Sequence, residues 1–226
     1  MTQSGVVQDQ ANPLADDSQP LAGRIAWQIR AQIIDGRRMP GMPLREVDLA
    51  AEFGVSRNTL REALQQLCRD GLATFVRNRG VEVRTLDRAS LRDIYTVRRV
   101  LELQALAGHD GAFESPVLDA MRATLELGEQ ARSAGDWRRV GTHSLAFHQQ
   151  VVALLGSAVL NEFFRNILAQ LRLIFAMNLD EAQFQQPWLV RDREIFSQIE
   201  AGQWMAARSL LERYIDDSEQ ALLAYV

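Results

Sequence analysis

The chain has 226 residues, of which 47% are hydrophobic and 24% are charged, and its formal net charge is −4. This length suffices for one small domain and a second of about 140 residues, each with its own apolar core. No apolar run is long enough for a membrane span, and the N-terminus lacks the basic and apolar segments of a signal peptide. We therefore expect a two-domain cytoplasmic protein. Its single cysteine, Cys68, excludes an internal disulfide.

The first elements are helical and follow a polar tail. Residues 1–19 are rich in Gln, Asp and Ser, a composition typical of disorder. Apolar residues then recur at helical spacing from Leu21 to Asp35, which predicts a helix ending at Gly36. Two prolines and a glycine interrupt the chain before a short second helix predicted over residues 46–53.

The segment that follows is the most informative part of the chain. Gly54 predicts a tight turn, and the hydroxyl of Ser56 can cap a helix by accepting a backbone N–H of its first turn. Four apolar residues at helical spacing face inward: Leu60, Ala63, Leu64 and Leu67. The other side carries Arg57, Asn58 and Arg61, whose guanidinium and amide groups suit base edges in the DNA major groove. An ordinary solvated helix fits this segment equally well, so the neighbouring elements decide.

A hairpin is predicted directly after this helix. Short apolar runs over residues 73–77 and 81–84 flank Asn78, Arg79 and Gly80, which are typical turn residues. Three helices followed by a hairpin predict a winged helix-turn-helix domain over residues 20–88. This region carries more Arg than Asp and Glu although the whole chain is acidic, which favours nucleic-acid binding at this end.

Residues 20–88 resemble the DNA-binding domain of the GntR family of bacterial transcription regulators. The resemblance is carried by Ile34, Gly36, Pro40, Gly41, Leu44, Glu46, Leu49 and Ala50, by residues 54–64, and by Leu67, Gly71, Leu72 and Gly80. It implies that Arg57, Asn58, Thr59 and Arg61 lie at the DNA and that the wing tip around Gly80 enters the minor groove.

One departure from the family pattern bears on sequence preference. Many family members carry Arg at the position of Val47, whereas this chain has Arg45 two residues earlier. The predicted DNA-binding residues are Arg45, Ser56, Arg57, Asn58, Thr59, Arg61, Arg79 and Gly80. Arg57 and Arg61 are candidates for bidentate recognition of guanine, although either could contact phosphate instead. Arg79 is a candidate minor-groove residue or else a mobile surface arginine.

The remainder of the chain, residues 90–226, reads as helices. Helical periodicity covers residues 91–109, 116–133, 136–155, 158–179, 187–201 and 203–225, with breaks at glycines. The sequence therefore predicts a mainly α protein whose C-terminal domain is an all-α, six-helix antiparallel bundle. This bundle resembles the FCD domain of the FadR subfamily, in its shorter VanR-like branch. The resemblance implies effector binding and dimerisation, and it rests on Val97, Arg98, Leu101, Glu102, Gly135, Asp136, Phe147, His148, Ala201 and Gly202.

Many FCD domains hold a divalent metal with one Asp and three His. The corresponding positions here are Ser144, His148, Asp192 and Tyr214, so only His148 is retained. One imidazole and one carboxylate are too few for a tight site, and the sequence therefore predicts no metal cofactor. The four positions still suggest a polar ligand pocket. The alternatives are a hydrogen-bonded core histidine and a packed tyrosine.

Arg98 extends the predicted pocket. It lies in a segment that is apolar on nearly every side, so its guanidinium is expected to point inward, where it needs an anion or several acceptors. Glu102, one helical turn later, could be that anion. In the family the matching Arg lies near the effector pocket, and many effectors are small carboxylates. The resemblance thus implies a small organic acid as effector.

Together these features predict a ligand-responsive transcription regulator and not an enzyme. We expect a repressor that binds a near-palindromic operator in double-stranded DNA as a homodimer and is released by a small organic acid. An enzyme built on His148 with Asp192 or Ser144 is an alternative, but no nucleophile elbow, phosphate loop or sufficient metal set supports it. A ligand-independent architectural DNA binder is a third, and the long second domain argues against it.

Overall fold

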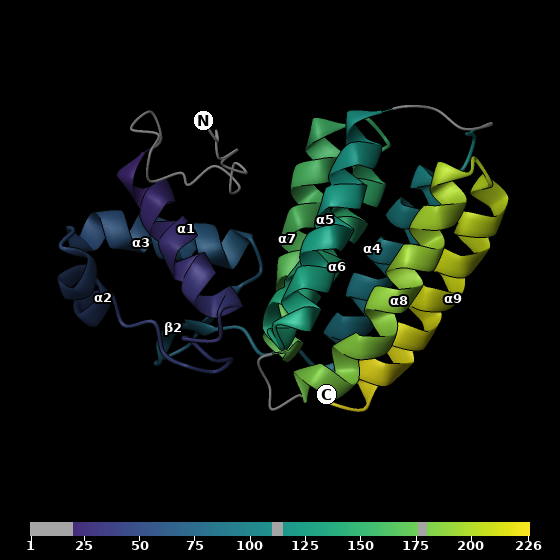
Figure 1. Ribbon diagram of the computed structural model, residues 1–226. Helices are drawn as coiled ribbons and strands as arrows, with labels where there is room; N and C mark the ends of the chain where they lie inside the picture. The colour runs from purple at the N-terminus through teal and green to yellow at the C-terminus, as the bar shows by residue number, and fades with distance from the viewer. Residues whose placement is uncertain (1–19, 110–114, 176–179) are drawn as a thin grey trace, which may run out of the picture. The chain divides into compact units, whose positions relative to one another are not determined.

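The computed structural model describes residues 20–109, 115–175 and 180–226 (Figure 1). The tail predicted over residues 1–19 lies outside them. The chain falls into two compact units that separate between Arg84 and Thr85. None of the helices in the described ranges is both long enough and apolar enough to cross a membrane.

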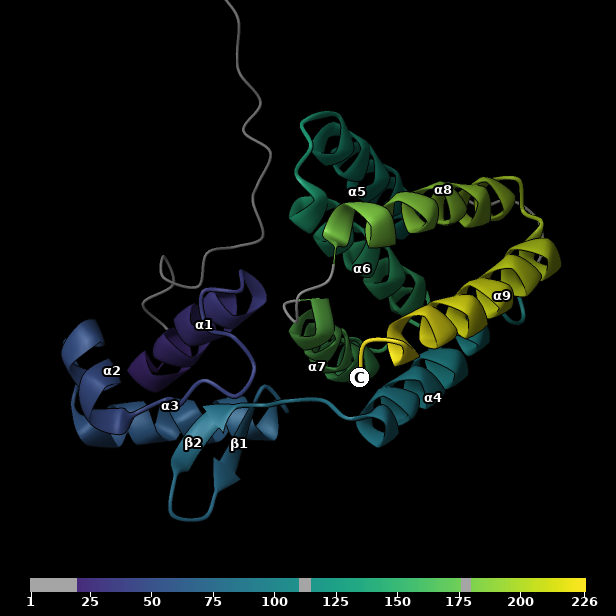
Figure 2. The same ribbon diagram turned by 90° about the horizontal axis from the view of Figure 1, so that it is seen from below.

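The first unit is the predicted winged helix-turn-helix. Its elements are α1 (Leu21–Ile34), α2 (Glu46–Phe53), α3 (Arg57–Arg69), β1 (Ala73–Val76) and β2 (Gly80–Val83). The two strands pair antiparallel, and Pro43 adds an isolated bridge to Glu82, so the segment before α2 lies against the hairpin. Figure 2 shows the hairpin extending away from the three helices of this unit.

Apolar periodicity and local caps account for this unit. α1 packs on α3, and Ile29, Ile33, Leu60 and Leu67 are fully buried where the unit forms its core. Gly54 has a φ of +63°, a left-handed conformation that ends α2 and that a residue with a Cβ adopts only with strain. The predicted turn between α2 and α3 is therefore confirmed, and the left-handed conformation of Gly54 is its physical reason.

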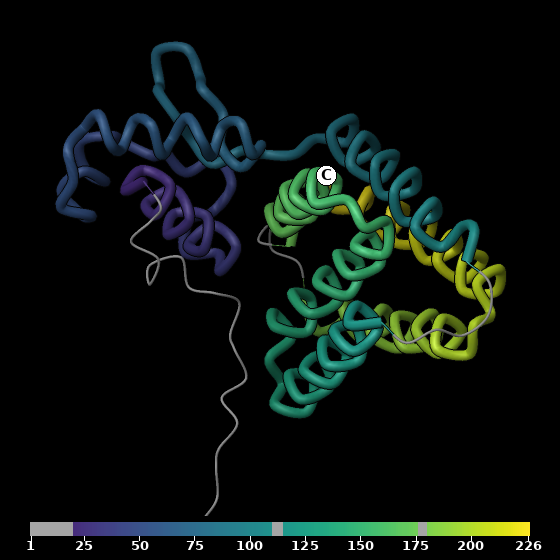
Figure 3. The backbone as a smooth tube through the Cα atoms, turned by 90° about the horizontal axis from the view of Figure 1, so that it is seen from above, coloured from purple at the N-terminus to yellow at the C-terminus, as the bar shows by residue number. Residues whose placement is uncertain are grey.

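The second unit is a bundle of six helices within the described ranges (Figure 3). They are α4 (Arg88–Ala105), α5 (Pro116–Ser133), α6 (Trp137–Ala153), α7 (Ala158–Phe175), α8 (Glu181–Glu200) and α9 (Trp204–Leu223). α6 contacts α4, α5, α7 and α8, and α9 packs on both α4 and α8. Side chains on α6 thus reach the middle of the bundle, where the predicted polar residues lie.

Three predicted helix boundaries in the bundle were wrong by three residues or more, among them the end of the first helix, which is Ala105 and not His109. The fifth helix of the bundle begins at Glu181 and not at Pro187, because Asp180 caps it by accepting a hydrogen bond from the Gln183 N–H at 3.1 Å. Pro187 sits in the second turn, where it removes one helical hydrogen bond without ending the helix. The first helix begins at Arg88, three residues earlier than expected, since Asp87 caps it. Of the helix predicted over residues 158–179, the last four residues lie outside the described ranges.

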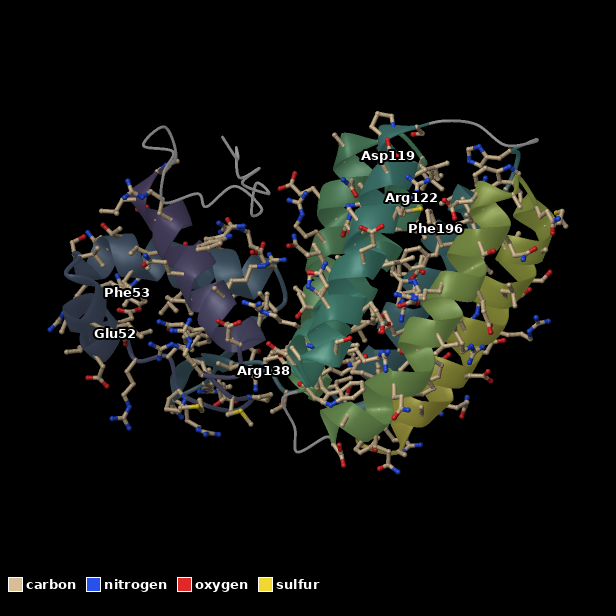
Figure 4. The ribbon with its side chains drawn as sticks, viewed as in Figure 1. Glu52, Phe53, Asp119, Arg122, Arg138 and Phe196 are labelled. Carbon is tan, nitrogen blue, oxygen red and sulfur yellow. The ribbon has the colours of Figure 1, made fainter. Side chains whose placement is uncertain are left out.

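Exposed ion pairs lie on the surface of the bundle and contribute little to its stability. Arg122 on α5 donates to Asp119 at 2.8 Å and to Glu200 on α8 at 2.7 Å, and its guanidinium lies 5.9 Å from the ring of Phe196 (Figure 4). Such exposed pairs contribute little because water and salt screen them. The stability of the bundle comes instead from its buried apolar side chains, among them Phe147 and Phe164.

Candidate DNA-binding surface and effector site

The N-terminal turn of α3 is capped by a hydroxyl group. Ser56 Oγ accepts a hydrogen bond from the Thr59 N–H at 3.1 Å and lies 2.8 Å from Thr59 Oγ1. Ser56 therefore acts as the predicted cap. Arg57 and Asn58 follow it and are exposed, while Thr59 is half-buried. The helix thus presents a guanidinium and an amide at its positively polarised end, the end that favours phosphate or base-edge acceptors.

Arg61 is held by a carboxylate on the preceding helix. Its Nε donates to Glu46 Oε1 at 3.1 Å and its Nη2 to Glu46 Oε2 at 2.8 Å. This bidentate pair joins α2 to α3, and the hydrogen bond from Arg61 lowers the pKa of the Glu46 carboxyl below its ordinary value. Glu46 consequently fixes the direction of the Arg61 guanidinium before any DNA is bound.

We expect Glu46→Gln to reduce sequence discrimination. The substitution removes a negative charge near the predicted DNA surface, so binding to random duplex should tighten, while Arg61 loses the partner that orients it. The ratio of specific to random-duplex affinity should therefore fall. Fluorescence anisotropy with both duplexes measures this ratio. Glu62→Gln, which removes an exposed carboxylate from α3, is the matched control; an equal change in both variants would show that charge alone is responsible.

The wing carries the remaining predicted DNA residues. The Arg79 N–H donates to the Val76 carbonyl at 3.0 Å, and Asn78 adopts a φ of 66° as the third residue of this turn. Arg79 is exposed and pairs with Glu82 at 3.3 Å, and Gly80 begins β2 with a φ of +84°. Arg45 is exposed directly before α2, next to Leu44, whose N–H donates to the Val81 carbonyl of β2 at 2.8 Å.

The centre of the bundle contains a row of buried charges of alternating sign. Arg98 Nε donates to Glu102 Oε1 at 2.7 Å, and His148 Nδ1 donates to the other oxygen of Glu102 at 2.5 Å. His148 Nε2 lies 3.4 Å from Asp192 Oδ1, a distance of an ion pair and not of a good hydrogen bond. The row joins α4, α6 and α8, and Glu102 is the anion that Arg98 required.

Opposing effects set the charge of the histidine in this row. Burial alone lowers the pKa of His148, but the Glu102 charge and the interactions with Asp192 and Glu102 outweigh it and raise that pKa above its ordinary value. Burial likewise raises the pKa of Glu102, yet the charges of Arg98 and His148 lower it overall. An imidazolium between two carboxylates is the state that this geometry favours.

Stability should therefore fall as the pH rises through the His148 pKa. A raised folded-state pKa gives stabilisation that is complete below the unfolded value of about 6.5 and is lost above the folded one. Urea unfolding between pH 6 and pH 9 measures this slope, and His148→Gln should remove the contribution. The half-buried His143, whose pKa burial lowers, gives the opposite sign; if His143→Gln flattened the slope and His148→Gln did not, the assignment would be wrong.

The structure brings all five predicted pocket residues together. Ser144 Oγ lies 3.2 Å from the Tyr214 hydroxyl, and the rings of Tyr214 and His148 have centroids 4.6 Å apart. The guanidinium of Arg98 lies 6.0 Å from the Tyr214 ring. Burial, followed by the charge of Asp192, raises the pKa of Tyr214 well above its ordinary value, so this residue presents a neutral hydroxyl.

These residues do not fit a divalent metal. His148 already uses Nδ1 on Glu102, which leaves only Nε2 and the Asp192 carboxylate as ligands. Among the residues that the structure describes, no group of three His, Cys, Asp or Glu side chains could hold a metal ion. Ser144 and Tyr214, which complete the four positions, are neutral and poor ligands for zinc or nickel.

We expect purified protein to carry little zinc, nickel or manganese. One imidazole and one carboxylate bind a metal ion only weakly, so metal analysis should show far less than one ion per chain. Treatment with EDTA should leave the unfolding midpoint unchanged if, as we expect, no ion contributes to the folded state. A stoichiometric metal content, or a midpoint lowered by EDTA and restored by one metal, would contradict this reading of the four positions.

A small cavity opens beside the charge row. Its volume is about 20 Å³, room for roughly one water molecule, and it is lined by residues of α4, α6, α7, α8 and α9. Arg98, Ser144 and Tyr214 line it, whereas His148 and Asp192 do not. Gln185 and Trp188 of α8 also line it, and neither residue was predicted from the sequence.

Both units are similar to known protein families. Residues 21–83 match the family model described as bacterial regulatory proteins of the gntR family, and residues 93–217 match the model of the FCD domain. The chain belongs to the GntR family. It is a GntR transcription regulator with an FCD effector-binding domain, and its relatives are regulators and not enzymes.

Individual relatives resemble this GntR regulator over different lengths. The crystal structure of a putative GntR regulator from Rhodococcus sp. RHA1 is 36% identical with a TM-score of 0.86, covering 91% of this chain and 98% of that one. The Nta operon transcriptional regulator of Aminobacter aminovorans is 33% identical over 59% of this chain and 63% of its own length. A probable D-xylose utilization operon transcriptional repressor of Paenarthrobacter nicotinovorans is 29% identical over 68% of this chain and 69% of that protein.

A boundary error explains why Gln185 of the GntR regulator was missed, whereas Trp188 lay inside the predicted helix and was not recognised. Gln185, Trp188 and Asp192 follow one another at intervals of three and four residues and therefore share a face of α8. Gly141, Ser144 and His148 repeat the same spacing on α6. With the helix taken to begin at Pro187, Gln185 fell outside it, although continued periodicity would have placed it opposite Gly141.

Proposed function

We propose that this GntR regulator is a repressor that binds a near-palindromic operator as a homodimer and releases it when a small organic acid enters the bundle. The observation that carries the proposal is Arg98, which is 2% exposed. Its Nε is paired with Glu102, whereas its Nη2 has no hydrogen-bond partner in the described residues. A buried guanidinium with a spare donor is suited to an acidic ligand.

The DNA-binding half of the proposal rests on the first unit. The exposed side chains of Arg57 and Asn58 follow the Ser56 cap, Glu46 orients Arg61, and Arg79 lies on the wing turn. A helix-turn-helix domain reads one half-site, so a two-fold operator calls for two copies of the chain. Such a role would place the protein with the chromosome in the bacterial cytoplasm.

The sensing half is proposed as metal-free. The six described helices α4 to α9 support assignment to the six-helix, VanR-like branch of the FadR subfamily. The metal positions of that fold are taken here by Ser144, His148, Asp192 and Tyr214, of which His148 is bound to Glu102. Arg98 and the hydroxyls of Ser144 and Tyr214 would then receive the acid directly. Their convergence on one cavity supports this.

Selection from a pool of random duplexes tests the DNA-binding role without knowledge of the target genes. We expect the enriched sequences to contain an inverted repeat whose half-sites lie about one or more helical turns apart. Sedimentation of the protein with the selected duplex should show two chains per site. Enrichment of no sequence, or of a single unrepeated half-site bound by one chain, would contradict the proposal.

A further inference from the structure

Three buried N–H donors around the cavity have no partner among the described residues. They are Nη2 of Arg98, Nε2 of Gln185 and Nε1 of Trp188. All three residues line the same cavity, although they come from two helices, α4 and α8. Buried donors without acceptors are costly, and native structures rarely leave several of them side by side. Because their residues line one cavity, an acceptor bound there could satisfy them together.

The charge of the cavity selects the kind of acceptor. Among the described residues, its lining contains the Arg98 guanidinium and no carboxylate. Glu102 compensates Arg98 only through Nε, and Asp192 lies one turn further along α8, outside the lining. An anionic oxygen group in the cavity would therefore meet three donors, and the nearest carboxylates, Glu102 and Asp192, are not among the described lining residues. A cation would meet the like charge of the Arg98 guanidinium.

Gly141 makes room for one of these donors. A Cβ on this residue would lie 2.5 Å from Nε2 of Gln185 and 2.9 Å from Nη1 of Arg172, closer than side-chain atoms tolerate. The absent side chain thus lets the Gln185 amide lie against α6 beside Ser144. Glycine in the middle of a helix is otherwise unfavourable, so its presence within α6 is explained by this close approach.

The rest of the cavity wall is mainly apolar and aromatic. Ring centroids lie 5.4 Å apart for Phe175 and Phe184, 5.8 Å for Phe184 and Trp188, and 5.1 Å for Trp188 and Tyr214. This row of four rings runs from α7 across α8 to α9. Leu145, Leu171 and Leu222 also line the cavity, as do Tyr95 and the hydroxyl-bearing Ser218. Aromatic faces and edges favour a flat apolar ligand body.

The geometry points to a compact aromatic monocarboxylate as the ligand, with its carboxylate on Arg98, Gln185 and Trp188 and its ring among the four aromatic side chains. This inference rests on the proposed function for the role of the ligand, but the site itself is argued from the donors and rings alone. The cavity of about 20 Å³ is smaller than such a ligand, so the aromatic side chains must move apart on binding. That movement would link the ligand to the packing of α7, α8 and α9.

Benzoate is the probe that tests the site, with benzamide as its neutral isostere and gluconate as a polar acid. Isothermal titration of the full chain, without DNA, should show benzoate binding at least tenfold more tightly than either compound. Gly141→Ala should weaken benzoate binding about tenfold or more, because the new Cβ displaces the Gln185 amide, while the helix itself gains in propensity. Gln185→Leu should do the same by removing the donor.

Gly128→Ala is the matched control, since Gly128 is a buried helical glycine of α5 whose Cβ would meet Leu189 and His143 and none of the three donors. It should bind benzoate as the unaltered chain does. Equal binding of benzoate and benzamide would overturn the anion site, and tighter binding of gluconate would overturn the aromatic wall. Tighter binding of phenylalanine would bring Asp192 into the site and overturn the inference, as would no binding of benzoate at millimolar concentration.

Benzoate titration and duplex selection together distinguish a failure of this inference from a failure of the proposed function. If duplex selection succeeds and benzoate fails, the site assignment is wrong and the regulator stands. If benzoate binds and operator affinity does not respond, the site stands and its regulatory role is wrong.

Discussion

Replacing Glu102 by Gln should lower the free energy of unfolding by about 3–5 kcal/mol, because it strands a buried cation. Glu102 is fully buried and hydrogen-bonded to both Arg98 and His148. Without its charge, His148 can lose its proton, but Arg98 cannot, since a guanidinium remains charged in proteins. The cost is electrostatic because Gln has nearly the same volume as Glu.

Urea denaturation at pH 7 measures this loss of stability. Two further variants, a control and a double variant, show whether the loss comes from the stranded charge. Asp93→Asn removes an exposed carboxylate from the same helix and should unfold at the denaturant concentration of the unaltered chain. The double variant with Arg98→Met should be more stable than Glu102→Gln alone, because it removes the stranded cation. If Glu102→Gln were as stable as Asp93→Asn, the alternating charge row would not support the bundle.

Replacing Arg57 by Ala should cost about 1–3 kcal/mol of operator binding, or roughly 5- to 150-fold in affinity. Arg57 is the exposed first residue of α3, directly after the Ser56 cap. If it contacts a guanine edge, its loss also relaxes base preference at one position of each half-site. A phosphate contact would weaken binding to every sequence alike.

Repeated duplex selection with the variant distinguishes these outcomes. Arg69→Ala, at the opposite end of α3, is the matched control: Arg69 is exposed and donates to Gln66 at 2.7 Å. It should leave the selected sequence unchanged. Unaltered affinity and preference in Arg57→Ala would remove this residue from the predicted surface.

Local signals in the sequence were sufficient for most of the helices. The Ser56 cap, the turn at Gly54 and the apolar spacing of α1 and α3 act within a few residues, so they could be recognised without the fold. Pro187 failed as a boundary signal because the Asp180 cap starts α8 one and a half turns earlier and the helix tolerates the missing hydrogen bond. That error hid Gln185.

The partnerships between distant residues could be predicted only in part. Glu102 was available to Arg98 because the two lie one helical turn apart, but its second bond goes to His148, which is 46 residues away. Glu46 and Arg61 are separated by 15 residues and a turn, and only the crossing of α2 and α3 brings them together. Periodicity shows which face of a helix is buried, whereas partners depend on how helices pack.

The central claim, that a ligand in the bundle controls DNA binding, is tested most directly by titrating the selected operator with protein in the presence and absence of saturating benzoate. We expect the acid to weaken operator affinity by roughly 5- to 150-fold, the usual range of coupling between two sites. This effect should disappear in Gly141→Ala and persist in Gly128→Ala. An operator affinity that stays the same while benzoate occupies the bundle would contradict the account.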